Sequence, residues 1–177
     1  VSHSWHDDPD EKWEALQRWR EEFKLEMGRE PRVWFDKFCI DQCHIQDSLA
    51  ALPIYLAGCD KLLVLHGAAY QSRLWCIMEL LTFIVMGATG DDLEVWQLRS
   101  CRADFSAFDA GHATCFKEED RSHLMGVIEA SLGSVKNFNR QVRCMSSRCV
   151  AKELSDVMRR QDLTIPDKDQ VGGADAA

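Results

Sequence analysis

The sequence predicts an α/β domain, with a central parallel sheet of about five strands and helices on both faces. Strand-like and helix-like segments alternate along the chain, which is typical of such sheets. Residues 61–66 form a continuous apolar run, as expected of a strand buried on both faces. Residues 73–86 are apolar nearly all round, as expected of a helix that is covered on most sides.

The size and charge of the chain narrow its organisation and its partners. Its 177 residues suit one domain, which we assign to residues 1–162, and the polar, small-residue segment 163–177 is expected to be a disordered tail or linker. The net charge of -8 argues against nucleic acid or an anionic membrane as the main partner. The apolar run 74–88 is interrupted by Glu79 and is too short for a membrane span, so we expect no span in this segment.

Cysteine usage indicates the compartment. The chain has eight cysteines, and Cys59, Cys76 and Cys115 lie inside apolar stretches, where a free cysteine behaves as a small buried hydrophobe. The sequence also shows no signal peptide. We therefore expect a reducing, cytoplasmic setting in which these thiols remain unpaired.

The N-terminal part predicts a strand, a helix and a second strand. Residues 1–4 look like the end of a strand that begins upstream. Asp8 and Pro9 form a strong helix start, and Gly28 is a suitable helix end. Residues 32–36 follow a proline and are predicted to form the second strand.

The rest of the chain continues the alternation. Apolar residues at helical spacing predict a helix over residues 45–56, which Pro53 is expected to kink or split into two pieces. The other predicted elements are strands at 93–98 and 113–116, and helices at 118–132, 135–142 and 150–160. Ligands of parallel α/β sheets bind outside the carboxyl ends of the strands, so the loops that begin near Ser4, Asp36 and His66 are the candidate binding loops.

Glu79 is the residue that most needs an explanation. It is the only charged side chain between Arg73 and Asp91, in the most apolar helix of the chain. Burying a carboxylate without partners costs several kcal/mol, or raises its pKa until the group is neutral. Either Glu79 faces a functional cleft at the first turns of this helix, or it lies on an exposed stripe or pairs with a lysine or arginine.

The segment Tyr70-Gln71-Ser72-Arg73-Leu74-Trp75-Cys76-Ile77-Met78-Glu79-Leu80 resembles the tyrosine, serine, Trp-Cys and Glu-Leu motif of TIR domains, especially those of plant type. The order of elements over residues 1–98 also resembles that family. The resemblance implies a flavodoxin-like three-layer sandwich, with residues 1–4 as its first strand.

A second resemblance overlaps the first. The Trp-x-Asp segment that ends at Asp36 and the Cys-Ile-Asp-Gln segment of residues 39–42 are similar to the signature of fungal heterokaryon-incompatibility domains. The spacing of Arg73, Trp75 and Glu79 is similar to a further motif of those domains. They are themselves TIR-like in fold, so both resemblances imply one architecture and leave the subfamily open.

The TIR resemblance implies a function. Many TIR domains cleave NAD between nicotinamide and ribose in stress or cell-death responses, and the resemblance places their catalytic glutamate at Glu79. NAD is then a substrate, and neither a cofactor nor a metal is implied. The residues expected to bind the substrate are His3, Ser4, Trp5, Asp36, Tyr70, Ser72 and Trp75. The alternative is an adaptor without catalysis, and both functions imply homotypic self-association.

Three weaker groups of residues suggest other chemistry. Cys39, Cys43 and His44 have no second ligand pair at zinc spacing, which argues against zinc. A nucleophilic pair of Cys76 with His66 is conceivable, although core packing explains Cys76 better. Asp7, Asp8 and Asp10 look like a metal cluster, but helix capping explains them without a metal.

Overall fold

The computed structural model describes residues 1–39, 45–99, 101 and 105–144. In these residues three parallel strands form one sheet in the order β1-β2-β3: β1 (Ser2–His3), β2 (Leu62–His66) and β3 (Leu93–Gln97). The predicted strands at 1–4, 61–66 and 93–98 are therefore confirmed. The parallel α/β class is confirmed as well, with three strands in the described part of the chain where about five were predicted.

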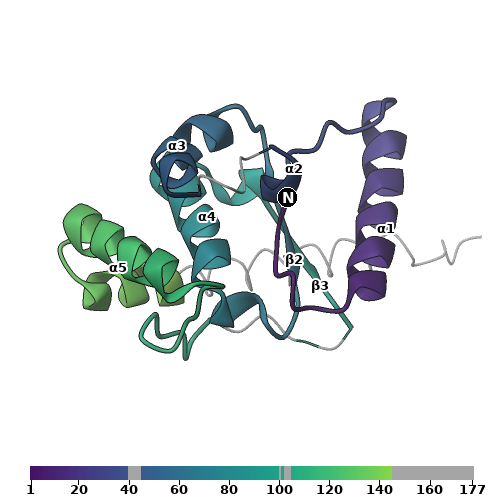
Figure 1. Cartoon of the computed structure of the whole chain (residues 1–177). Helices are drawn as coiled ribbons and strands as arrows, with labels where there is room; N and C mark the ends of the chain where they lie inside the picture. The colour runs from purple at the N-terminus through teal and green to yellow at the C-terminus, as the bar shows by residue number, and fades with distance from the viewer. Residues whose placement is uncertain (40–44, 100, 102–104, 145–177) are drawn as a thin grey trace, which may run out of the picture.

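Helices cover both faces of the sheet (Figure 1). Helix α1 (Pro9–Met27) lies on one face, where Ala15 and Trp19 pack with Leu63 and Leu65 of β2. Helices α3 (Ile45–Ala57), α4 (Leu74–Val85) and α5 (Glu118–Leu132) lie toward the other face. Every residue of β2 is buried, because its alternate side chains point into these two cores.

Local sequence signals explain the ends of α1. The Asp8 side chain accepts hydrogen bonds from the backbone nitrogens of Asp10 and Glu11, both at 2.9 Å, and Pro9 occupies the first turn. Gly28 ends the helix in the left-handed conformation, at φ 66°. The predicted helix start and stop are therefore confirmed.

Two predicted strands are wrong. Residues 33–35 have no regular secondary structure, and Asp36 begins a short helix, α2 (Asp36–Cys39). The Val1 nitrogen donates a hydrogen bond to the Trp34 carbonyl, which connects this segment to the start of β1. Strand β1 itself has only two residues, so it offers little backbone for further pairing. Residues 113–116 form one isolated bridge, between Arg73 and Thr114, and so pair with the loop before α4 instead of with the sheet.

The helix predictions fare better. Helix α3 runs through Pro53 as one element, so the predicted split does not occur. Helix α4 is buried on most sides, as predicted, and α5 ends at Gly133 in the left-handed conformation. Residues 135–144 are also helical, while the predicted helix at 150–160 and the tail at 163–177 lie outside the described residues. A further 3-10 turn, η1 (Tyr70–Ser72), precedes α4, and a second, η2 (Gly90–Asp92), precedes β3.

Two general properties of the described residues follow from these elements. The six described cysteines are free thiols. None of the described helices combines the length and the apolar character that crossing a membrane requires.

Candidate functional site around Glu79

Glu79 lies in the second turn of α4 and faces β1. Its side chain is 3% exposed, which excludes the exposed stripe that the sequence left open. Oε2 accepts a hydrogen bond from Ser2 Oγ at 2.6 Å, and Oε1 accepts one from the Trp75 indole nitrogen at 3.3 Å. Among the described residues its side-chain partners are therefore neutral groups, and the alternative of pairing with a lysine or arginine finds no support there.

The surroundings of Glu79 favour its neutral form. Burial raises the pKa of Glu79 to about 8, and the negative charge of Asp36 adds to this effect. The hydrogen bonds from Ser2 and Trp75 act in the opposite direction, because they stabilise the carboxylate. Glu79 is thus mainly protonated at pH 7, yet it keeps two donors that an ionised form can use.

Tyr70 and Cys76 connect the start of α4 to β1 beside Glu79. The Tyr70 side chain is fully buried, with its hydroxyl 2.8 Å from Ser2 Oγ and donating to the Cys76 carbonyl at 3.2 Å. The Cys76 thiol donates to the His3 carbonyl at 3.3 Å and so ties the first turn of α4 to β1. Burial raises the pKa of this thiol well above its usual value, which makes Cys76 an inert core residue.

Aromatic side chains surround the end of β1. The His3 ring makes edge contacts with Trp5 and Phe35, at centroid distances of 4.4 and 6.0 Å, and Phe35 makes another with Phe38. Trp5 is 49% exposed, and the Lys12 ammonium lies 5.7 Å from its ring centroid. Burial lowers the pKa of His3, and its Nδ1 is a buried atom without a hydrogen-bond partner among the described residues. These rings offer flat apolar surfaces at the carboxyl end of β1.

The loops after β1 and β2 are joined by Asp7. Its Oδ1 accepts a hydrogen bond from the Ala69 backbone nitrogen at 2.8 Å, across 62 residues of sequence. Asp8 alone provides the helix cap, so the capping explanation holds for Asp8 and is wrong for Asp7. In the described residues, no group of three or more potential metal ligands comes together, and Cys43 and His44 lie outside them.

The structure therefore separates the predicted site residues into two groups. Tyr70 and Trp75 contact the Glu79 network directly, and Asp36 acts on Glu79 and on His3 through its charge. Trp5 joins this group through its contact with His3. Ser4 and Ser72 serve their own loops instead.

Ser4 and Ser72 have identified local partners. Ser4 Oγ accepts from the His6 backbone nitrogen at 3.1 Å, and the Ser4 carbonyl accepts from Lys12 Nζ at 2.8 Å. Ser72 is exposed, and its hydroxyl donates to the Ala69 carbonyl at 2.8 Å. Both serines therefore stabilise loops at the carboxyl edge of the sheet, and these loops are the ones that the sequence predicts to bind ligands.

Sequence reasoning missed two members of the site. Ser2 was grouped with a truncated strand, although a small polar residue next to Val1 in a strand is a signal that one face meets a polar group. Asp7 was explained as part of a helix cap. The preferred explanation of Cys76 as a core residue is confirmed, since its side chain is buried and its thiol donates to the His3 carbonyl. His66 instead approaches Cys101, with 3.6 Å between Nδ1 and Sγ.

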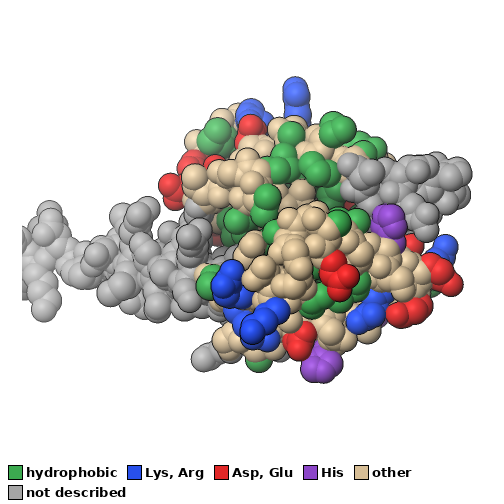
Figure 2. Space-filling view, turned by 90° about the vertical axis from the view of Figure 1, so that its left-hand side faces the viewer, with side chains coloured by type: hydrophobic (Ala, Val, Ile, Leu, Met, Phe, Trp, Pro, Cys, Tyr) green, Lys and Arg blue, Asp and Glu red, His purple; other side chains and the backbone are tan. Residues whose placement is uncertain are grey.

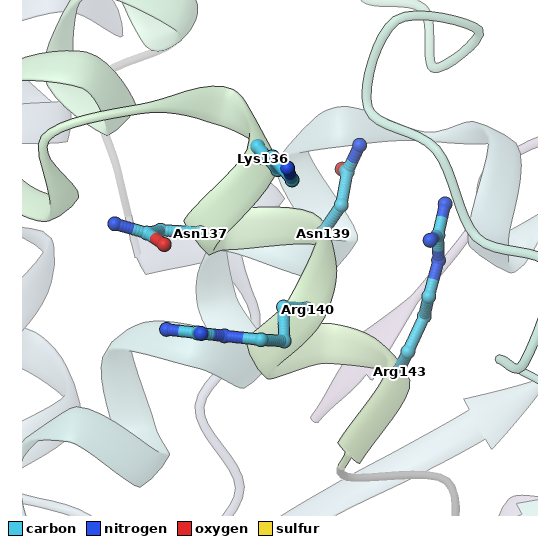
Figure 3. A pocket seen from close by; sticks show the side chains of 5 residues that line it. All are labelled: Lys136, Asn137, Asn139, Arg140 and Arg143. Carbon is cyan, nitrogen blue, oxygen red and sulfur yellow. The ribbon is translucent and has the colours of Figure 1, made fainter.

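A separate hollow lies against the helix of residues 135–144. It is lined by Lys136, Asn137, Asn139, Arg140 and Arg143. Figure 3 shows that these side chains diverge, with Asn137 and Arg140 on one side of the helix and Asn139 and Arg143 on another. Asn139 and Arg143 are also committed to holding the helix against the loop at residues 108–110. The hollow therefore lacks the convergent polar groups of a binding site.

Comparison with known proteins adds no identification. No family model, curated protein or solved structure matches this chain.

Proposed function

We propose that this chain is an intracellular TIR-like signalling domain that cleaves NAD between nicotinamide and ribose. The observation that carries this proposal is Glu79, a buried carboxyl on α4 whose side-chain partners in the described residues are the neutral donors Ser2 and Trp75. Strongly perturbed carboxyl groups of this kind are concentrated at functional sites. The resemblance of residues 70–80 to the TIR motif supports the same residue independently.

The reaction asks little of the protein beyond stabilising positive charge. The bond from ribose C1′ to the nicotinamide nitrogen breaks, and its electron pair neutralises the nicotinamide ring. Water adds to the resulting ribosyl oxocarbenium ion, so that NAD and water give nicotinamide, ADP-ribose and a proton. An ionised Glu79 stabilises the oxocarbenium ion electrostatically.

Access to Glu79 requires a local change. Trp75 is only partly buried, and its indole covers Oε1 through the 3.3 Å hydrogen bond. Rotation of this side chain exposes the carboxyl group, and a ribose hydroxyl can then replace the indole as donor. The rings of His3, Trp5 and Phe35 supply stacking surfaces for nicotinamide or adenine close to the same strand.

The test is release of nicotinamide from NAD by the full chain. Glu79→Ala and Glu79→Gln are expected to lose turnover by at least a hundredfold, while Glu129→Gln, an exposed control on α5, keeps it. Because the ionised form is the active one, turnover is expected to rise with pH toward about 8, the pKa of Glu79. Full turnover in Glu79→Ala would remove the assignment.

A non-catalytic adaptor is the second candidate, and exposed apolar side chains favour it. Phe38 on α2 is 79% exposed, and Ile54 on α3 is 74% exposed. The ring of Trp34, which precedes α2, stacks on the ring of Tyr55 of α3, with 5.8 Å between the ring centroids. Figure 2 shows hydrophobic side chains gathered above the centre of the face that carries α3 and α5. Exposed apolar side chains that gather on one face are typical of protein-protein contact sites.

Light scattering at rising protein concentration tests self-association, which both candidates imply, and release of nicotinamide by the same samples separates them. Phe38→Ser and Ile54→Ser are expected to abolish self-association, whereas Val85→Ser, a 63% exposed control on α4, leaves it intact. Assembly of the wild type without any release of nicotinamide would favour the adaptor. A wild type that stays monomeric would contradict the adaptor function.

A further inference from the structure

Two hydroxyl-bearing side chains and one backbone carbonyl form a continuous chain behind Glu79. Oε2 of Glu79 lies 2.6 Å from Ser2 Oγ, which lies 2.8 Å from the Tyr70 hydroxyl oxygen. That hydroxyl lies 3.2 Å from the carbonyl oxygen of Cys76. The Glu79, Ser2 and Tyr70 side chains are at most 3% exposed, so bulk water does not supply alternative partners.

The proton count of this chain fits a neutral Glu79. Tyr70 has one hydroxyl proton, which it donates to the Cys76 carbonyl. Ser2 then donates its own proton to the Tyr70 oxygen, and the protonated Glu79 donates to Ser2. Each of the three O–H groups has one acceptor in line, and no buried donor is left unsatisfied.

The same atoms also accommodate an ionised Glu79. When the proton leaves, Ser2 turns its hydroxyl toward Oε2, and Tyr70 turns its hydroxyl toward Ser2. The Trp75 indole continues to donate to Oε1. Only two hydroxyl rotations are required, and no heavy atom moves. A buried acid without such neighbours would stay neutral, because its charge would be unsatisfied.

We propose that Ser2 and Tyr70 are positioning residues that let Glu79 lose and regain its proton inside a closed site. This inference rests on the proposed function, in which Glu79 acts as a carboxylate. The other titratable groups that face Glu79 are the amino group of Val1, Asp36 of α2 and the Cys76 thiol of α4. In the described hydrogen bonds, none of these three groups donates a proton to the Ser2 or the Tyr70 hydroxyl.

Ser2 and Tyr70 together form a proton relay, and replacing each of them is expected to shift the pKa of Glu79 in opposite directions. Ser2→Ala removes a donor to the carboxylate, so the pKa of Glu79 rises. Tyr70→Phe leaves the Ser2 proton without an acceptor in the neutral state, whereas in the ionised state Ser2 loses only a donor and still donates to Oε2. The neutral state therefore loses more, and the pKa of Glu79 falls. Loss of one such hydrogen bond changes the proton affinity by roughly tenfold. A merely structural role would move both variants in the same direction or not at all.

The experiment is a carbon-13 NMR titration of the Glu79 carboxyl group in the full chain, without NAD. The wild-type midpoint is expected near 8, with a higher midpoint in Ser2→Ala and a lower one in Tyr70→Phe. Ser2→Thr restores the wild-type midpoint, because it keeps the hydroxyl. Tyr55→Phe, which alters the second of the two tyrosines, leaves the midpoint unchanged. Amide spectra confirm that each variant is folded.

The outcomes separate this inference from the proposed function. Opposite shifts without release of nicotinamide by the wild type would keep the relay and reject NAD cleavage. Unchanged midpoints, or shifts of the same sign in Ser2→Ala and Tyr70→Phe, would overturn the relay even if the wild type cleaves NAD.

Discussion

The carboxyl group of Asp7 packs directly against Gly67. A Cβ atom at Gly67 would lie 2.3 Å from Cγ of Asp7, closer than real side-chain contacts allow. The same carboxyl group accepts the Ala69 backbone hydrogen bond at 2.8 Å, and Asp7 is only 7% exposed. The loops after β1 and β2 are thereby held together at the carboxyl edge of the sheet, beside the candidate site.

We expect Gly67→Ala to destabilise the protein by about 1–3 kcal/mol, because the buried Asp7 carboxyl group would have to move away from the new Cβ and strain its hydrogen bond to Ala69. The measurement is the free energy of unfolding from urea denaturation. In an Asp7→Ala background the same glycine substitution is expected to cost much less, since the clashing atoms are gone. Equal costs in both backgrounds would show that the contact with Asp7 is not the cause.

Gly126 provides the opposite case. It is an exposed residue inside α5, and a Cβ there would meet no atom within 4 Å. Gly126→Ala is therefore expected to stabilise the protein by roughly 0.5–1 kcal/mol, since alanine loses less backbone entropy in a helix. A lower thermal midpoint than the wild type would contradict this expectation.

Asp8 tests the sequence signal that predicted α1. Because its carboxylate satisfies two backbone nitrogens at 2.9 Å, Asp8→Ala is expected to cost about 1 kcal/mol of unfolding free energy. Asp8→Asn keeps an acceptor and is expected to lose less. Asp10→Ala serves as the control, because Asp10 contributes only its backbone nitrogen to the cap. Equal losses in Asp8→Ala and Asp10→Ala would refute the capping role.

The sequence predicts the parts of the fold that local physics determines. The buried strand β2 and the apolar helix α4 are recognisable because they are covered on both sides, and α1 because its cap and its terminal glycine are local signals. Residues 33–35 show the limit of this approach. Their β-propensity is real, but strand formation depends on pairing with the two residues of β1, which local sequence does not reveal.

The candidate site shows the same limit. Glu79 was predictable, because a lone acid in an apolar helix is visible in the sequence. Its partner Ser2 lies 77 residues away, and the link from Asp7 to Ala69 spans 62 residues. Such partners are brought together by the parallel order of β1 and β2, so only the folded chain identifies them.

Keeping Glu79 buried lowers the stability of the folded protein at alkaline pH. Burial raises the pKa of Glu79 from 4.5 to about 8 in the folded protein. The folded protein therefore holds a proton that the unfolded chain releases between these pH values, and the free energy of unfolding falls as pH rises from 4.5 to about 8. Above that window the loss is complete, at a value on the order of 5 kcal/mol.

Glu79→Gln removes this dependence, because an amide does not titrate. Its amide nitrogen can donate to Ser2 Oγ, and its oxygen can accept from Trp75, as the protonated acid does. We expect the variant to be more stable than the wild type at pH 8.5 and nearly equal to it at pH 5. Urea denaturation at both pH values measures the difference. A stability difference that is the same at both pH values would mean that Glu79 is already ionised in the folded protein at pH 5, and that burial does not hold its proton.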